Sequence, residues 1–215
     1  YSDIYNAMIA PMSPYGVRGA LWYQGEQNAG AGDGDIYQLK MRALIRGWRE
    51  KWGQQDFSFY SVQLPNFITT ADWPPIRDAQ RRSLSEPDTG MAIIIDVGND
   101  NDIHPTNKQD PGNRLAALAL ANELGQSIVP SGPVLHTTTL EGNQIRVHFD
   151  PVGGGLFVGT KSGANPVVET AGALQNFEIA GADKVFVNAT ATIDGSTVLV
   201  SSPSVPAPLY VRYCH

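Results

Sequence analysis

The sequence predicts an α/β fold, a parallel three-layer α/β/α sheet with helices on both faces, followed by a small β-sandwich-like module. Over residues 17–124, strand-like apolar runs alternate with helical patterns, which is typical of right-handed crossovers between parallel strands. From about residue 130, short β-rich runs are separated by Gly, Pro and Asp-Gly turns, without a further helical pattern. We therefore place one domain at residues 1–129 and a C-terminal β module at residues 130–215.

Three strands and three helices are predicted in the first domain. Residues 17–23 form a short apolar run that ends at Gln24 and Gly25, as a buried strand entering a loop would. Residues 35–52 place apolar side chains at helical spacing, and Gly53 closes this helix; the predicted stripe is Ile36, Leu39, Ala43, Leu44, Trp48 and Trp52. The later elements are expected in the order strand, helix, strand, helix at residues 57–64, 78–84, 91–96 and 108–124.

Two of these segments also predict burial. Residues 91–96 are a continuous run rich in β-branched side chains, which indicates a strand buried on both faces. The centre of the last helix, residues 115–121, is apolar nearly all round, so we expect that helix to be packed on most sides.

Turn signals define the strands of the β module. Residues 133–149 alternate in hydropathy around Glu141-Gly142-Asn143, which indicates a β-hairpin. Further strand-like runs occur at residues 185–193, 197–201 and 209–213.

Composition excludes several classes of function. Charged residues make up 17% of the chain, its net charge is −6, and no basic run of five or more occurs, so a nucleic-acid partner is not expected. No stretch approaches 18 apolar residues, so no membrane partner is expected. Cys214 is the single cysteine, which rules out an intrachain disulfide.

The first polar cluster follows the first predicted strand. Ligand sites in parallel sheets lie at the carboxyl ends of the strands, where Gln24, Glu26 and Asn28 occur here. The amide donors of Gln24 and Asn28 suit stabilisation of an oxyanion, and Gly25 lets the backbone approach a ligand. Glu26 could orient those donors or bind a sugar hydroxyl. The alternative interpretation is a glycine turn whose amides only satisfy the loop backbone.

The second cluster, residues 96–105, follows the third predicted strand. Histidine shuttles protons near neutral pH, and Asp102 could bind one ring nitrogen of His104 while the other faces a nucleophile. Two alternatives compete. Asp96, Asp100 and Asp102 offer oxygen ligands for calcium, although the glycine and glutamate spacing of the best-known calcium loop is absent. The segment could also be a solvated Asn/Asp turn.

Four segments together resemble the sialate O-acetylesterase family of the SGNH-hydrolase superfamily. They are Tyr5-Asn6-Ala7-Met8-Ile9-Ala10-Pro11-Met12, Trp22-Tyr23-Gln24-Gly25-Glu26 with Asn28, Arg77-Asp78-Ala79-Gln80, and Asn101-Asp102-Ile103-His104-Pro105 with Asn107-Lys108. Phe177-Glu178-Ile179-Ala180-Gly181-Ala182 and Val211-Arg212-Tyr213 resemble the β module of the same family. The resemblance implies a parallel hydrolase sheet and removal of O-acetyl groups from sialic acids or related sugars, without a metal or organic cofactor. It also implies an extracellular or periplasmic location.

Residue roles follow from the same resemblance. His104 would be the general base and Asp102 its orienting acid, with Asp100 as the weaker candidate for that role. Gln24 and Glu26 would line the acyl-binding pocket. The partner of this site would be an O-acetylated sugar substrate.

The serine that this mechanism needs is not found in the sequence. The family carries it in an N-terminal Gly-Gln-Ser-Asn-type motif, which does not occur here. Gly125-Gln126-Ser127 matches superficially, but it follows a helix and Ile128 replaces the Asn. We therefore expect the serine to lie in an N-terminal half of the domain. That half is either a partner, as a separate chain, or simply absent from this sequence. A sheet cut in this way exposes an unpaired edge. The alternative function is a non-catalytic carbohydrate-binding or assembly fragment.

Overall fold

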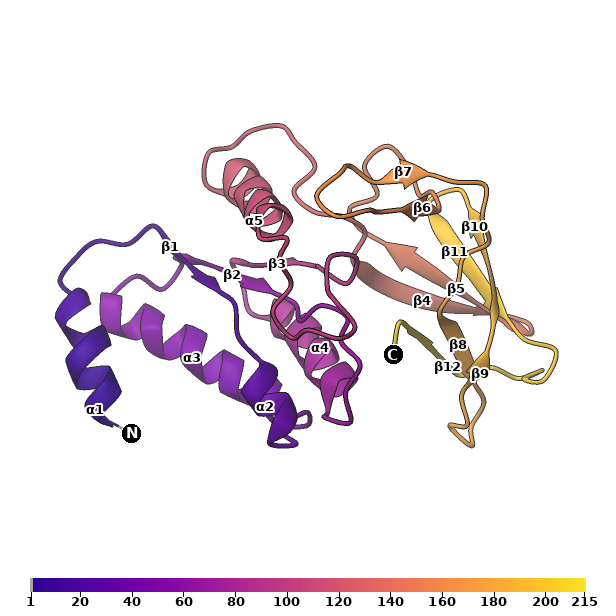
Figure 1. Ribbon diagram of the computed structural model, residues 1–215, viewed down its shortest axis with the longest axis horizontal. Coiled ribbons are helices and arrows are strands. Elements are labelled where there is room, and N and C mark those ends of the chain that lie inside the picture. The colour runs from indigo at the N-terminus through magenta and orange to yellow at the C-terminus, as the bar shows by residue number, and fades with distance from the viewer. Residues whose placement is uncertain (1) are drawn as a thin grey trace. The chain divides into compact units, whose positions relative to one another are not determined.

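The computed structural model describes residues 2–215, which form two compact units, one ending at Gln126 and the other beginning at Ser127. The first unit holds helices and parallel strands, and the second holds strands and loops (Figure 1). No helix formed by residues 2–215 is long and apolar enough to span a bilayer.

A three-stranded parallel sheet in the order β1-β2-β3 organises the first unit. Its strands are β1 (Gly19–Trp22), β2 (Ser58–Val62) and β3 (Thr89–Ala92). Helices α3 (Tyr37–Trp52) and α4 (Trp73–Arg82) lie on one side of the sheet and α5 (Gln109–Asn122) on the other (Figure 1). The predicted α/β class with a parallel sheet is confirmed.

Shorter elements complete this unit. They are α1 (Ser2–Ile4), the π-helical turn η1 (Tyr5–Ile9), the 3₁₀ turns η2 (Ala10–Met12) and η3 (Ser83–Ser85), and α2 (Glu26–Gly30).

Alternation along the strands divides the core between the two faces. Phe59 of β2 belongs to the larger cluster, which includes Tyr37 and Ile45 of α3. Val62 faces the other way and packs in a smaller cluster with Leu115 of α5. Each face thus packs against helices that follow the strands.

Helix α3 has nearly the predicted extent, but two members of the predicted apolar stripe are exposed, Ile36 at 46% and Leu39 at 60%. Its buried residues Tyr37, Met41 and Ile45 recur every four positions and so share one face. The helix ends at Gly53, which has a φ of 64° and whose N–H is bonded to the carbonyl groups of Arg49 and Glu50.

The predicted strand at residues 91–96 is wrong in its extent, because β3 ends at Ala92. Arg114 of α5 donates a hydrogen bond to the carbonyl oxygen of Ile93, and the N–H of Val97 bonds back to Ile94. These contacts satisfy the backbone without a neighbouring strand, so the chain leaves the sheet early.

The predicted short helix at residues 78–84 begins earlier than expected. Helix α4 starts at Trp73, with Pro74 and Pro75 in its first turn, where proline is tolerated because those N–H groups have no partner within the helix. Trp73 is buried, and its indole N–H donates to the carbonyl of Pro65 at 2.7 Å.

Packing around α5 is also less extensive than predicted. Only Pro111 and Leu118 are buried along this helix. On β1, Leu21 has 65% of its surface exposed although β1 belongs to the same sheet. The face of the sheet on the α5 side is therefore covered over β2 and β3 and open at β1.

Two antiparallel sheets and a small two-stranded ribbon form the second unit. One sheet has the order β10-β11-β5-β4, a second has the order β12-β8-β9, and β6 pairs with β7. Apolar side chains of both larger sheets form one core, including Val147, Ile179 and Val200. The strands are β4 (Leu135–Glu141), β5 (Gln144–Phe149), β6 (Gly159–Thr160), β7 (Val168–Glu169), β8 (Phe177–Ala180), β9 (Val187–Asn188), β10 (Thr190–Asp194), β11 (Thr197–Ser201) and β12 (Tyr210–Tyr213).

The predicted hairpin in this unit is confirmed. Glu141 of β4 faces Gln144 of β5, so two residues form the turn, and Gly142 there has a φ of 64°.

Candidate active site

Direct contacts join the loops that follow β2 and β3. The side-chain amide of Asn66 donates to the carboxylate of Asp100 at 2.7 Å, and the N–H of Ile68 donates to the carbonyl of Asp100 at 3.0 Å. A Cβ atom at Gly98 would lie 2.2 Å from Oδ1 of Asn66, so the loops approach too closely for any side chain there. The two loops therefore form one surface at the carboxyl edge of the sheet.

The loop after β1 reaches the same surface. The ammonium group of Lys108 lies 5.5 Å from the centre of the Tyr23 ring, close enough for a cation–π contact. Ile103, next to His104 in sequence, packs against the core cluster that contains Ala29 of α2. The two predicted clusters thus occupy neighbouring loops.

Gln24 is held through its backbone by two buried side chains. Its carbonyl oxygen accepts hydrogen bonds from the hydroxyl of Tyr37 at 2.9 Å and from the amide nitrogen of Gln80 at 3.1 Å. Gln80, which is 1% exposed, also accepts the N–H of Leu64 at 2.9 Å. Helices α3 and α4 thereby fix the turn after β1 against the end of β2.

A chain of hydrogen bonds leads from the Gln24 side chain to the surface. Its Nε2 lies 2.6 Å from Oδ1 of Asn28, whose Nδ2 lies 2.6 Å from a carboxylate oxygen of Asp33. The ammonium group of Lys40 pairs with the same carboxylate at 2.5 Å. The Lys40 and Asn28 hydrogen bonds hold the pKa of Asp33 below its ordinary value. The two amides therefore bond to side chains, contrary to the simple turn interpretation.

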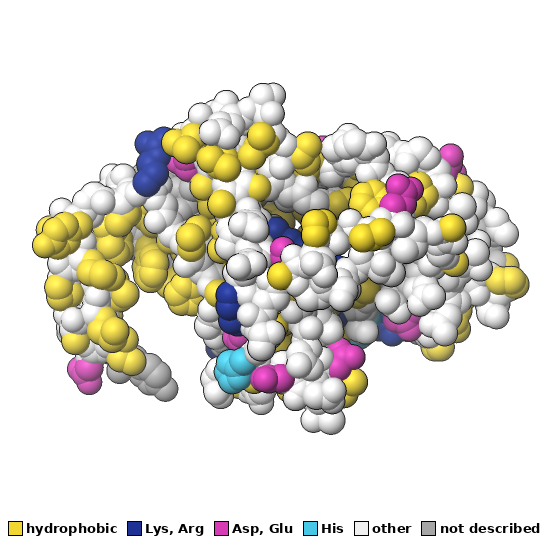
Figure 2. Space-filling model, turned by 45° about the horizontal axis from the view of Figure 1, so that its top comes forward, with side chains coloured by type: hydrophobic (Ala, Val, Ile, Leu, Met, Phe, Trp, Pro, Cys, Tyr) yellow, Lys and Arg dark blue, Asp and Glu magenta, His cyan; other side chains and the backbone are white. Residues whose placement is uncertain are grey.

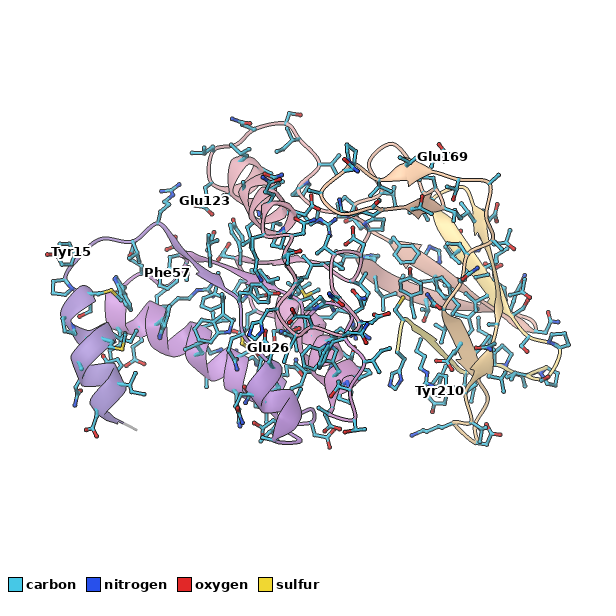
Figure 3. All side chains as sticks on the ribbon, in the orientation of Figure 1. Tyr15, Glu26, Phe57, Glu123, Glu169 and Tyr210 are labelled. Atoms are coloured by element: carbon cyan, nitrogen blue, oxygen red, sulfur yellow. The ribbon has the colours of Figure 1, made fainter. Side chains whose placement is uncertain are left out.

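Glu26 is half-buried and is the first residue of α2, at the end of that helix that follows the turn after β1 (Figure 3). Its negative charge adds to the effect of burial in raising the pKa of the Tyr23 hydroxyl. Burial is likewise the main reason why the pKa of Tyr37 is raised. Tyr37 thus stays protonated at neutral pH, and its hydroxyl can donate to Gln24.

His104 lies on the open surface of its loop with 85% of its side chain exposed. Its Nδ1 lies 3.6 Å from a carboxylate oxygen of Asp102, which is longer than a hydrogen bond. The same oxygen accepts the backbone N–H of His104 at 2.8 Å. The pair is therefore adjacent, as the sequence indicated, but Asp102 holds the backbone of His104 and not its ring in this structure.

The calcium alternative is not supported. Both carboxylate oxygens of Asp96 lie 2.6 Å from the guanidinium nitrogens of Arg114, and one oxygen of Asp100 is bonded to Asn66. Within residues 2–215, no group of three or more His, Cys, Asp or Glu side chains is arranged to hold a metal ion.

Sequence reasoning gave no role to four residues that build this site: Asp33, Tyr37, Lys40 and Gln80. Gln80 lies in a segment of the family resemblance, and Asp33 lies in the Gly- and Asp-rich loop after the first cluster. Their contacts with the turn cross between helices, so they are not visible as a local pattern. Conversely, no hydrogen bond or ion pair joins His104 to Gln24 in the part of the chain that the structure describes.

The parallel α/β sheet thus carries an amide-rich turn and a histidine loop at its carboxyl edge, where proteins of this fold class bind their ligands. The family model for carbohydrate esterases described as sialic acid-specific acetylesterases matches residues 1–121, and the chain belongs to this family. The predicted family and its esterase class are thereby confirmed.

Relatives agree with this assignment. Sialate O-acetylesterase of Rattus norvegicus is 33% identical over 156 residues, covering 62% of this chain and 29% of the relative. The Homo sapiens protein of the same name is 31% identical over 156 residues, covering 62% of this chain and 30% of the relative. A solved structure of a carbohydrate acetylesterase from Xanthomonas citri matches with a TM-score of 0.85 and 41% identity, covering 98% of this chain and 48% of that chain. The chain thus spans about half of the solved relative and under a third of the curated relatives.

Proposed function

We propose that this chain supplies the general base and the acyl-binding residues of a serine carbohydrate O-acetylesterase, with the nucleophilic serine lying outside this chain. The substrate would be a sialic acid or a related sugar that carries an acetyl ester. Family membership supports the reaction class, and the relatives named above as acetylesterases support the substrate class.

The observation that carries the proposal is the meeting of the two clusters at one edge of the sheet. Lys108 contacts Tyr23 beside the Gln24 turn, and Ile103 beside His104 packs on the core cluster of α2. These contacts support a site in which the proposed base and the proposed acyl-binding residues come from neighbouring loops and a serine from another segment reaches both.

The chemistry follows the usual order of serine esterases. The serine oxygen bonds to the acetyl carbonyl carbon while His104 takes the hydroxyl proton. The N–H groups of Gln24 and of the turn at Gly25 stabilise the negative oxygen of the tetrahedral intermediate. His104 then gives its proton to the sugar oxygen as the bond to the sugar breaks. Water releases acetate from the acetyl-enzyme by the same proton relay.

Asp102 is assigned as the orienting acid in this mechanism. Its carboxylate oxygen lies 3.6 Å from Nδ1 of His104. The two groups must therefore move closer together to form a hydrogen bond. Such contacts often tighten only when substrate binds. Asp100 is the weaker choice, because its carboxylate is already bonded to Asn66.

The proposal is tested by acetate release from an acetylated sugar or p-nitrophenyl acetate, with this chain combined with the serine-bearing segment. We expect His104→Ala to lower kcat by about 10³-fold or more, since the proposed general base would be lost. His136→Ala is the matched control, because His136 is exposed on β4 of the second unit, and it should retain full activity.

Undiminished activity of His104→Ala would refute the assignment of the base. Binding of acetylated sugar without acetate release, even with the serine segment present, would favour the alternative, a non-catalytic carbohydrate-binding fragment.

A further inference from the structure

The hydrogen-bonded chain from Gln24 to Lys40 suggests a role for residues outside the predicted site. We propose that Asp33, paired with Lys40, is a positioning residue that determines which end of the Gln24 amide is available to the substrate. This inference rests on the proposed function, because it concerns the acyl-binding role of Gln24.

The direction of the chain starts from the carboxylate. An ionised carboxylate only accepts hydrogen bonds, so Asn28, 2.6 Å away, must present its NH₂ group to Asp33. The oxygen of the Asn28 amide then faces Gln24, again at 2.6 Å, so Gln24 must present its NH₂ group in return. One fixed charge therefore sets the orientation of two amides, whose oxygen and nitrogen would otherwise be interchangeable in shape.

The other end of Gln24 agrees with this direction. Its Oε1 lies 3.1 Å from the hydroxyl of Tyr37, whose single proton lies between this oxygen and the Gln24 carbonyl oxygen, 2.9 Å away, so both positions suit an acceptor. With its oxygen and one N–H so occupied, Gln24 keeps its second N–H for a ligand. An amide in the opposite orientation would place oxygen toward Asn28 and could not provide the same donor to a developing oxyanion.

Lys40 keeps Asp33 in its charged form. Their ion pair is 2.5 Å long, and the Asp33 side chain is only 17% exposed. Because no other cation contacts this carboxylate among the described residues, α3 contributes, through Lys40, the cation that pairs with the orienting carboxylate. Asp33 and Lys40 themselves do not touch the reacting atoms in this scheme.

The first test is kinetic and uses the complete esterase, this chain joined to the serine-bearing segment. Asp33→Asn keeps the shape of the side chain, but its amide can donate as well as accept hydrogen bonds. The side-chain amides of Asn28 and Gln24 can then flip by 180°. We expect kcat to fall about ten-fold with KM nearly unchanged, a smaller loss than removal of an oxyanion donor causes. Asp35→Asn is the matched control, since Asp35 is an exposed carboxylate in the same loop, and it should leave both constants unchanged.

A double-mutant cycle separates positioning from general stabilisation. In the Gln24→Ala background, Asp33→Asn should lower kcat no further, because the amide that it orients is gone. An equal loss in both backgrounds would overturn the inference. If Gln24→Ala lowered kcat but Asp33→Asn did not, the inference about Asp33 would be overturned and the proposed role of Gln24 would stand. Full activity of Gln24→Ala would refute both.

The second test needs no activity. In ¹⁵N-labelled samples of the complete esterase, the side-chain NH₂ resonances of Gln24, identified by their loss in Gln24→Ala, should shift in Asp33→Asn and stay in place in Asp35→Asn. Unchanged Gln24 resonances in a folded Asp33→Asn variant would overturn the inference even if the proposed function held.

Discussion

Gly25 turns the chain directly after β1 with a φ of 154°, a conformation that side-chain-bearing residues rarely adopt. A Cβ atom at this position would lie 3.1 Å from the amide nitrogen of Gln80 and 3.2 Å from methyl groups of Ile76 and Leu64. Both the backbone and the surrounding core thus require glycine beside Gln24. The sequence pointed to close backbone approach here, and the structure adds that the neighbour is the protein's own core.

We predict that Gly25→Ala lowers the free energy of unfolding by about 1–3 kcal/mol, from backbone strain and crowding together. Gly47→Ala is the opposite case, because Gly47 lies inside α3 and a Cβ atom there has no neighbour within 4 Å. It should stabilise the chain by about 0.5–1 kcal/mol. Urea unfolding measures both changes, and equal effects of the two substitutions would contradict this account.

Helix α5 is tied to the amino ends of β1 and β2 by the carboxylate of Glu123 (Figure 3). This carboxylate accepts hydrogen bonds from the hydroxyls of Ser58 and Tyr60, the latter at 3.0 Å, and pairs with Arg18 at 2.9 Å. These partners, the Ser58 hydroxyl above all, hold the pKa of Glu123 below its ordinary value although partial burial opposes them. One side chain thus joins three elements at the edge opposite the candidate site.

We predict that Glu123→Gln destabilises the chain by about 1.5–3 kcal/mol at pH 7, the range for hydrogen bonds to a charged group. Because the folded-state pKa is lowered, this contribution is complete above the unfolded value of about 4.3 and is lost as the pH falls through the folded value. Denaturant unfolding from pH 7 to pH 3 should therefore show the difference from the native sequence shrinking with acidity.

Glu50→Gln serves as its control, since Glu50 is exposed on α3. It should change the stability little at any pH, and a deficit of Glu123→Gln that stays constant down to pH 3 would contradict the assigned role.

Elements whose own side chains determine them were predictable from sequence. The helical spacing of apolar side chains over residues 35–52 predicted α3, and Gly53 predicted its end, although the buried face proved to be that of Tyr37, Met41 and Ile45. The end of β3 was not predictable in this way, because it depends on Arg114 bonding the carbonyl of Ile93 from a later helix. The start of α4 was missed for a different reason, because the helix was predicted only from residue 78, after two prolines that in fact suit a first turn.

The candidate site shows the same division at the scale of the whole first unit. Strand order was enough to select the loops with Gln24 and His104, since the carboxyl ends of parallel strands share one edge. It was not enough to find Gln80 or Asp33, whose contacts with the Gln24 turn depend on how helices and loops pack. Periodicity predicts that a helix has a buried face but not what that face contacts.

The open face at β1 has a consequence for the molecule in solution. β1 has one strand partner among the described residues, and Leu21 on it is 65% exposed. Four further exposed apolar side chains lie in the N-terminal segment, where Figure 2 shows apolar side chains gathered on the surface. They are Ile4, Met8, Met12 and Tyr15. An unpaired strand next to apolar surface favours pairing with another chain.

We therefore predict that the chain alone self-associates at concentrations of about 10–100 μM, as exposed strand edges commonly do. Leu21→Lys should suppress this association, because a charge on an edge strand opposes pairing and must be desolvated in any contact. Leu39→Lys is the matched control, since Leu39 is 60% exposed but lies on α3, where no strand can pair. Sedimentation velocity over a concentration series distinguishes the two. If both variants reduced association equally, general surface hydrophobicity would be the cause and the edge of β1 would have no special part in it.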